Sequence, residues 1–218
     1  MGCGGQIPLP SNFIKKAHNL VHEYGGICIA DEIQIGFGRL GKNFWGFEYH
    51  GLEPDIVTVG KSMGNGHPLS AVITTREIAE HFNNGMEYFN SFGGNPVSST
   101  IGHEVLKIIK DEDLQKNAKN VGSYLKGMLL ELQKDYSLIG NVRGEGLFLG
   151  IEIVNSNGSL EPLAKVAKYI VNEMKKKRAL LSTDGPDENI IKIKPPIVFN
   201  EQNADFIVEN LRSIISKI

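Results

Sequence analysis

The sequence has few cysteines, no long apolar segment and no excess of charge of one sign. Its 218 residues include two cysteines, Cys3 and Cys28, too few for a disulfide framework or a cysteine-rich zinc cluster. No apolar run approaches the ~20 residues that a membrane-spanning helix needs. Lysine and arginine number 23 against 25 aspartate and glutamate residues. This balance gives no reason to expect a nucleic-acid or membrane partner.

Apolar residues are plentiful, and in the first half of the chain they occur in short continuous runs. Residues 27–30, 56–59 and 71–74 are three such runs. Continuous rather than alternating apolarity predicts strands that are covered on both faces, as in a parallel α/β sheet. A helix that ends near Tyr24 precedes the first run, and Ser11 or Asn12 can cap its start.

The rest of the chain alternates long helices with short strands. Amphipathic patterns predict helices over about 75–82, 97–109, 114–134, 162–177 and from 201 onward. Apolar runs predict strands over about 139–143, 147–154, 179–182 and 190–193. We therefore expect part of an α/β domain with a parallel-rich sheet in residues 1–120. A small α+β domain is expected in residues 121–218.

Two of the early predicted strands end in an acidic and a basic residue, which together are typical of a cofactor-binding site. Asp31 follows the first strand and Lys61 follows the second. In open α/β sheets, ligands bind beyond the carboxyl ends of the strands. An amine and a carboxylate at one such edge suit an aldehyde cofactor with a basic ring nitrogen. The lysine would form an imine, and the aspartate would keep the ring nitrogen protonated.

The segments around this pair resemble class III, fold-type-I enzymes that use pyridoxal 5'-phosphate (PLP). Ile29–Gly41 is similar to the family's signature, and Pro54–Pro68 is similar to its Schiff-base segment. Phe89–Pro96 resembles the turn that reaches across a dimer to the neighbouring subunit's cofactor phosphate. The resemblance implies a PLP-transferase fold, with residues 1–120 as the C-terminal part of the PLP-binding large domain. It also implies a homodimer, or a dimer of dimers, with shared active sites.

The resemblance assigns a role to each matching position. Lys61 is implied as the Schiff-base lysine and proton shuttle, and Asp31 as the partner of the pyridinium nitrogen. Gln34 would contact the phenolic oxygen of the ring, and Ser91 would contact a phosphate in the partner subunit. The family usually has threonine at the position of Ser91, and both residues offer a hydroxyl. The alternatives are a surface amide for Gln34 and a turn-stabilising hydroxyl for Ser91.

One residue and three short segments resemble the phospho-lyase branch of the family, which acts on ethanolamine phosphate or 5-phosphohydroxy-lysine. They are His67, Tyr88–Asn90, Ser182–Pro186 and Ile191–Pro196. Lys192 stands where the family's aminotransferases usually carry an arginine that clamps the substrate carboxylate. Lysine cannot reproduce the two-pronged grip of a guanidinium, although it can bind an anion as a point charge.

The expected activity is therefore a PLP-dependent lyase that releases phosphate, ammonia and an aldehyde, with Lys192 as a substrate-binding residue. One alternative is an aminotransferase of the alanine–glyoxylate type. Another is an inactive chain that retains only a dimerisation surface. The resemblance also implies an N-terminal half that would supply a phosphate-binding turn, so we expect these 218 residues alone to be inactive. The family points to mitochondria, with the cytoplasm as the alternative.

No metal site is expected. His18 and His22 are four residues apart on a predicted helix, a spacing that can bind zinc. The intervening residues contain no glutamate to act as a general base, and no third ligand is near in the sequence. This pair is interpreted as part of a solvated helix face.

Overall fold

The computed structural model describes residues 1–10 and 12–218, which form two compact units. We call them the three-stranded unit and the four-stranded unit, and each is described by itself. The three-stranded unit comprises Leu9–Gly38 and Asn43–Leu114, and the four-stranded unit comprises Met1–Pro8, Arg39–Lys42 and Gln115–Ile218. The expected domain boundary at residues 120 and 121 stays a prediction.

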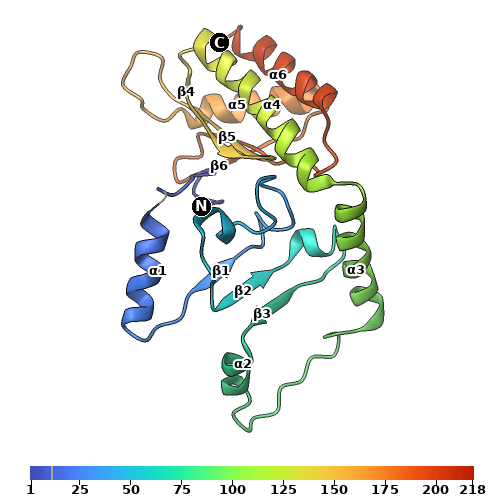
Figure 1. The fold of residues 1–218 in the computed structure, drawn as a ribbon. Helices are drawn as coiled ribbons and strands as arrows, with labels where there is room; N and C mark the ends of the chain where they lie inside the picture. The colour runs from blue at the N-terminus through green and yellow to red at the C-terminus, as the bar shows by residue number, and fades with distance from the viewer. Residues whose placement is uncertain (11) are drawn as a thin grey trace. The chain divides into compact units, whose positions relative to one another are not determined.

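The sheet of the three-stranded unit has the order β1-β2-β3 (Figure 1). Its strands are β1 (Ile29–Asp31), β2 (Ile56–Val59) and β3 (Ala71–Thr74). β1 and β2 are parallel, with Asp31 paired to Thr58. β3 is antiparallel to β2, so the third strand departs from the parallel sheet that its apolar run indicated. The parallel pair brings the carboxyl ends of β1 and β2 to one edge of the sheet.

Helices and short 3-10 segments connect these strands. They are α1 (Phe13–Glu23), η1 (Phe47–His50), η2 (Lys61–Met63), α2 (Arg76–Phe82) and α3 (Pro96–Asp111). Asn12 makes no side-chain cap on α1, and Ser11 lies outside the described residues. By contrast, α3 has a complete start, because the Asn95 side chain accepts a hydrogen bond from the Ser98 N–H and Pro96 occupies the first turn.

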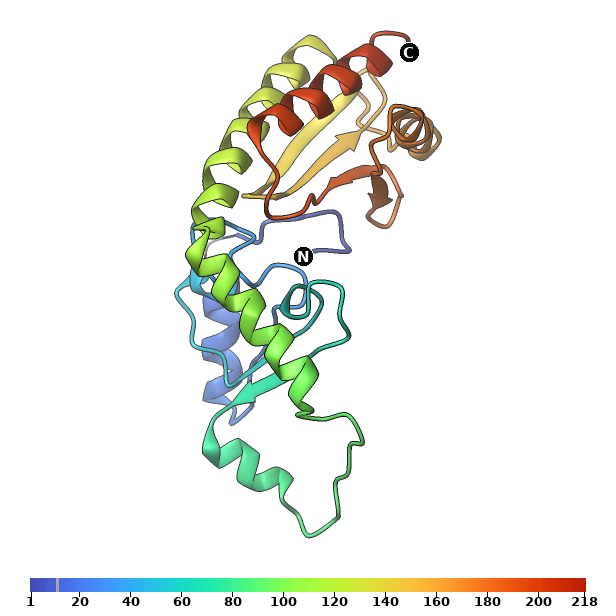
Figure 2. The same cartoon turned by 90° about the vertical axis from the view of Figure 1, so that its right-hand side faces the viewer.

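The four-stranded unit contains an antiparallel sheet with the order β4-β5-β7-β6. Its elements are α4 (Leu114–Asp135), β4 (Ile139–Glu145), β5 (Phe148–Ile153), α5 (Ala164–Lys176), β6 (Ser182–Asp184), β7 (Ile190–Ile193) and α6 (Glu201–Ile215). Strands and helices share one core, to which Leu125, Leu149, Ile170 and Leu211 contribute fully buried side chains. Figure 2 shows α4 and α6 running alongside this sheet.

The two units differ in how well their apolar residues are covered. In the three-stranded unit, Ile29 is 60% exposed, Val72 is 66% exposed, and α1 buries none of its residues. The described residues therefore leave β1 and β3 largely uncovered, whereas Val57 and Val59 of β2 are buried. Among residues 1–10 and 12–218, no helix is long and apolar enough to span a bilayer.

This contrast predicts unequal backbone protection in the 218-residue chain. We expect amide hydrogens in β5 and β7 to exchange slowly, because their side chains lie in a continuous core. Amides in β1 and β3 should exchange much faster, because little apolar surface secures these strands. Hydrogen–deuterium exchange followed by mass spectrometry measures both sets in one sample. Equal protection in the two sheets would contradict this prediction.

Candidate functional site

Lys61 lies where the chain leaves β2 and turns sharply. It follows the buried Gly60 and begins η2 with a φ angle of 38°, in the left-handed region. Non-glycine residues rarely adopt this conformation, and such strain concentrates at functional sites. The side chain is exposed, as is that of Asp31 at the end of the neighbouring strand. The structure thus places the predicted amine and carboxylate at the same edge of the sheet.

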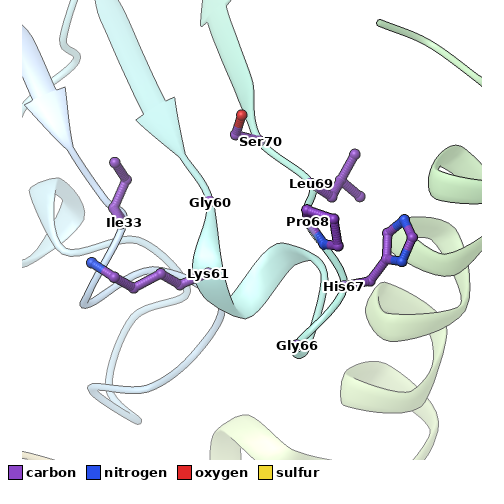
Figure 3. A pocket seen from close by; sticks show the side chains of 8 residues that line it. All are labelled: Ile33, Gly60, Lys61, Gly66, His67, Pro68, Leu69 and Ser70. Atoms are coloured by element: carbon purple, nitrogen blue, oxygen red, sulfur yellow. The ribbon is translucent and has the colours of Figure 1, made fainter. Parts of the chain in front are cut away.

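A depression of about 650 Å³ surrounds Lys61. It is lined by Ile33, Gly60, Lys61, Gly66, His67, Pro68, Leu69 and Ser70 (Figure 3). In Figure 3 the Lys61 side chain extends toward the segment that carries Ile33. The Ile33 N–H in turn donates to Asp31 Oδ1 over 3.1 Å, so one short segment contributes to the lining and orients the carboxylate.

The Gly64–Pro68 turn beside Lys61 is fixed to the start of α3. His67 Nε2 lies 2.7 Å from the Ser98 hydroxyl oxygen, which also accepts a hydrogen bond of 2.9 Å from Asn95 Nδ2. A Cβ at Gly64 would lie 2.0 Å from the His67 carbonyl oxygen, so the turn requires glycine there. From its sequence context, His67 was predicted only to mark the resemblance to the phospho-lyase branch, and no local pattern indicated this anchoring role.

Glu32 anchors a second loop next to Asp31. Its buried carboxylate accepts hydrogen bonds from the N–H groups of Gly46 and Phe47, both at 2.8 Å. Burial raises the pKa of the Glu32 carboxyl above its ordinary value, and the two N–H donors act in the opposite direction. The role of Glu32 was not predicted from the sequence. An acidic pair directly after an apolar strand was the available signal, because one carboxylate can face the site while its neighbour faces inward.

The structure places Gln34 and Ser91 in loops of the same unit. Gln34 is half-buried in the turn that follows β1. Ser91 is exposed at the start of a turn in which Asn90 Oδ1 accepts hydrogen bonds from the N–H groups of Phe92 and Gly93. Asn90 therefore provides the turn-stabilising interaction that was the alternative role for Ser91. The cofactor contacts of Gln34 and Ser91 stay predictions.

Lys192 belongs to the four-stranded unit and is engaged in an ion pair. Its Nζ lies 2.9 Å from Asp184 Oδ2 across the β6–β7 pair, and this oxygen also accepts a hydrogen bond from Gln6 Nε2 at 2.8 Å. Both charged side chains are largely buried, with 23% and 15% exposed. A lysine whose charge is compensated in this way has less attraction to offer a substrate anion. Its substrate-binding role stays a prediction.

The family follows from comparison with known proteins. The model of the family described as aminotransferase class-III matches residues 1–215. The chain belongs to this family. It is 46% identical to the Drosophila melanogaster protein named alanine–glyoxylate aminotransferase 2-like, over 99% of this chain and 44% of that protein. It is 45% identical to a mitochondrial alanine–glyoxylate aminotransferase 2 homolog from Arabidopsis thaliana, over 100% of this chain and 45% of that protein.

A solved structure resembles the chain closely. A phospholyase from Arthrobacter in complex with phosphoethanolamine superposes with a TM-score of 0.96 and is 39% identical, covering 100% of this chain and 51% of that one. The chain thus spans about half the length of the proteins it matches. The similarity confirms the expected PLP fold-type-I class, and family membership implies pyridoxal phosphate as the cofactor.

The described residues fit this cofactor on their own chemistry. Lys61 offers a primary amine at a strained, solvent-accessible turn, and Asp31 offers a carboxylate at the end of the adjacent parallel strand. These are the two groups that an aldehyde and a pyridine nitrogen require. The loops that carry them are fixed by Glu32 and by the His67–Ser98 hydrogen bond, which is how a site is held in place.

Replacing Glu32 tests the anchoring of the Asp31 loop. Glu32→Gln should lower the free energy of unfolding of the three-stranded unit by about 1–3 kcal/mol, because an amide nitrogen cannot accept the second backbone N–H bond. Trp45 is the sole tryptophan and belongs to this unit, so its fluorescence during urea unfolding reports the effect.

Glu48→Gln is the matched control. Glu48 is exposed and accepts one hydrogen bond, from the Trp45 N–H, which a glutamine oxygen can still accept. Its effect should stay within about 0.5 kcal/mol.

Because burial raises the folded-state pKa of Glu32, the folded protein binds the Glu32 proton more tightly than the unfolded chain does. Stability should therefore fall as the pH rises from the ordinary glutamate pKa through the folded one, and Glu32→Gln should lack this fall. Equal effects of the two variants would exclude the anchoring role.

Proposed function

We propose that this chain is the C-terminal half of a PLP-dependent phospho-lyase. Its substrate is a phosphorylated amine, either ethanolamine phosphate or 5-phosphohydroxy-lysine, and the products are an aldehyde, ammonia and phosphate. The observation that carries the proposal is the placement of Lys61 on a strained turn beside the strand that ends in Asp31. The likeness to a phospholyase in complex with phosphoethanolamine supports the choice of substrate class.

Each residue has a defined part in this reaction. Lys61 would hold the cofactor through Nζ, Asp31 would face its ring nitrogen, Gln34 its phenolic oxygen, and Ser91 a phosphate in a partner subunit of a homodimer. When bound, pyridoxal phosphate supplies an electron sink that stabilises negative charge on the carbon next to the substrate nitrogen.

Lys61 is the proton carrier in this proposal. Once the substrate amine has taken its place, the freed Lys61 Nζ would accept the proton from the carbon that bears the nitrogen. The C–O bond to phosphate on the adjacent carbon would then break, and the bonding pair would leave with phosphate. The unsaturated amine that remains reacts with water to give the aldehyde and ammonia. No second keto acid enters this balance, and this distinguishes the elimination from transamination.

The ion pair of Lys192 favours elimination over transamination of an α-amino acid. A guanidinium grips a carboxylate with two parallel hydrogen bonds, and lysine lacks this geometry. Here the ammonium is also engaged by Asp184. This position is therefore poorly suited to clamp a substrate carboxylate, and ethanolamine phosphate has none.

The names of the fly and plant relatives favour an aminotransferase of the alanine–glyoxylate type as the second candidate. The plant relative is described as mitochondrial, which supports a mitochondrial location, with the cytoplasm as the alternative. Fractionation of cells that produce the protein distinguishes the two compartments.

The role of Lys61 can be tested in a chain completed by the N-terminal half of the Arthrobacter phospholyase. Incubation with pyridoxal phosphate, borohydride reduction and peptide mapping should place the label on Lys61, because it lies on the strained turn. Lys61→Arg should lose the label and all turnover while keeping the positive charge. Lys42→Arg, at another exposed lysine, should keep both. A label on a different lysine would refute the assignment.

The reaction type is tested on the same completed chain. Phosphate and ammonia should be released from ethanolamine phosphate or 5-phosphohydroxy-lysine without any keto acid, because the proposed elimination needs no second substrate. A colorimetric phosphate assay and an ammonia assay, each with the Lys61→Arg variant as the blank, measure this release. Turnover that requires a keto acid and yields no phosphate would favour the aminotransferase.

A further inference from the structure

Four potential metal ligands converge at the other edge of the three-stranded sheet. His18 and His22 lie one turn apart on α1, Cys28 directly precedes β1, and Asp55 directly precedes β2. One ligand atom from each of the four residues lies within 4.8 Å of all the others. The histidine pair was expected to be a solvated helix face, but the fold brings it two further ligands that lie far from it in the sequence.

The parallel pairing of β1 and β2 explains this convergence. Asp55 and Ile56 both donate their backbone N–H groups to the Cys28 carbonyl oxygen, at 3.0 and 3.2 Å. The starts of the two strands are thereby held side by side, and α1 runs down to this end of the sheet (Figure 1). Asp31 ends β1 and Lys61 follows β2, at the opposite ends of the same strands. The cluster is therefore separate from the proposed cofactor site.

Hydrogen bonds within the cluster hold its potential metal ligands in place. The Cys28 N–H donates to Asp55 Oδ2 at 2.6 Å, and His22 Nε2 lies 2.8 Å from the same oxygen. These two contacts fix the Asp55 carboxylate beside Cys28 and His22. His18 Nε2 lies 3.2 Å from the Glu53 carbonyl oxygen. A carbonyl only accepts, so this contact uses Nε2 as the donor and leaves Nδ1 as the nitrogen that a metal would bind.

We propose that His18, His22, Cys28 and Asp55 bind a single Zn²⁺ ion that fastens α1 to the starts of β1 and β2. Two imidazoles, a thiolate and a carboxylate are ligands that zinc accepts, and a set of four protein ligands is typical of structural sites. Zn–N bonds of about 2.0–2.1 Å and Zn–S bonds of about 2.3 Å place tetrahedral ligands roughly 3.3–3.6 Å apart. The widest separations in the cluster, up to 4.8 Å, would therefore shorten on binding, while the 2.8 Å His22–Asp55 contact would open slightly.

A structural ion at this place has a clear physical role. α1 buries none of its residues, so apolar packing contributes little to its attachment within the described part of the chain. Zinc binds cysteine as a thiolate, so binding at Cys28 would release the thiol proton and couple the ion to folding.

The untagged 218-residue chain, stripped with a chelator, is the protein to titrate. Cobalt(II) should bind one ion per chain and show the thiolate-to-cobalt charge-transfer band and the strong visible bands of tetrahedral coordination. Zinc should displace cobalt and raise the urea midpoint of Trp45 fluorescence, because an ion bound only by the folded state stabilises it.

Two ligand variants and two matched controls decide the outcome. Cys28→Ser and His18→Asn should each weaken zinc binding by more than the roughly 10- to 100-fold that loss of an outer partner costs. Both should abolish the shift of the Trp45 midpoint. Cys3→Ser and His103→Asn, at exposed positions outside the cluster, should bind zinc as the unmodified chain does. Retention of tight binding in either ligand variant would overturn the proposal. So would the absence of a 1:1 complex, or loss of binding in Cys3→Ser; in these cases the cluster is a hydrogen-bonded attachment of α1 alone.

Discussion

The parallel pairing of β1 with β2 is the constraint on which the three-stranded unit depends. Three residues of β1 pair with β2; the register aligns the starts of the two strands and brings their ends to within one residue of each other. Because parallel strands point the same way, everything that follows them meets at one edge and everything that precedes them meets at the other. Asp31 and the Lys61 turn gather at the first edge, and Cys28 and Asp55 at the second.

Pairing alone would not position side chains for chemistry, because the segments beyond the strands are loops. Two contacts limit their freedom. The buried Glu32 carboxylate fastens the Gly46–Phe47 loop beside Asp31, and the His67–Ser98 hydrogen bond fastens the turn after Lys61 to α3. Both anchors are polar groups largely removed from water, so an unmade bond would cost about 1–3 kcal/mol. That cost favours one arrangement of the loops and helps to maintain the strained backbone of Lys61.

Sequence patterns predicted most of the elements, and the reasons for the misses are physical. β2, β3 and β7 occupy the expected residues, since each is a compact apolar run between clear turn signals. β6 lies at Ser182–Asp184 rather than at residues 179–182, because Ser182 and Asp184 pair opposite Lys192 and Ile190 although their side chains are polar. The direction of β3 could not be predicted either, because a four-residue apolar run has the same pattern in a parallel and in an antiparallel sheet.

The site shows the same division between local and non-local information. Asp31 and Lys61 could be predicted for two reasons. Each comes at the end of an apolar run, and the segments around them resemble those of class III PLP enzymes. The His67–Ser98 bond and the Glu32 anchor join residues 14 to 31 positions apart, and Lys192 meets Asp184 across a strand pair. No spacing rule covers such contacts, which depend on how the chain folds back.

Exposure of the three-stranded sheet links these observations. The described residues leave Ile29 and Val72 largely open, whereas the four-stranded unit has a continuous buried core. A sheet in this state gains little from apolar burial, so hydrogen bonds and charges carry more of its organisation. That is the setting in which one bound cation has a large effect: two ligands from α1 and one from the residue before each of β1 and β2 would close contacts that apolar packing does not supply. The two edges of the sheet therefore have different roles. Four protein ligands leave a metal ion no open position for substrate, whereas Lys61 at the other edge is exposed and can be reached by a substrate.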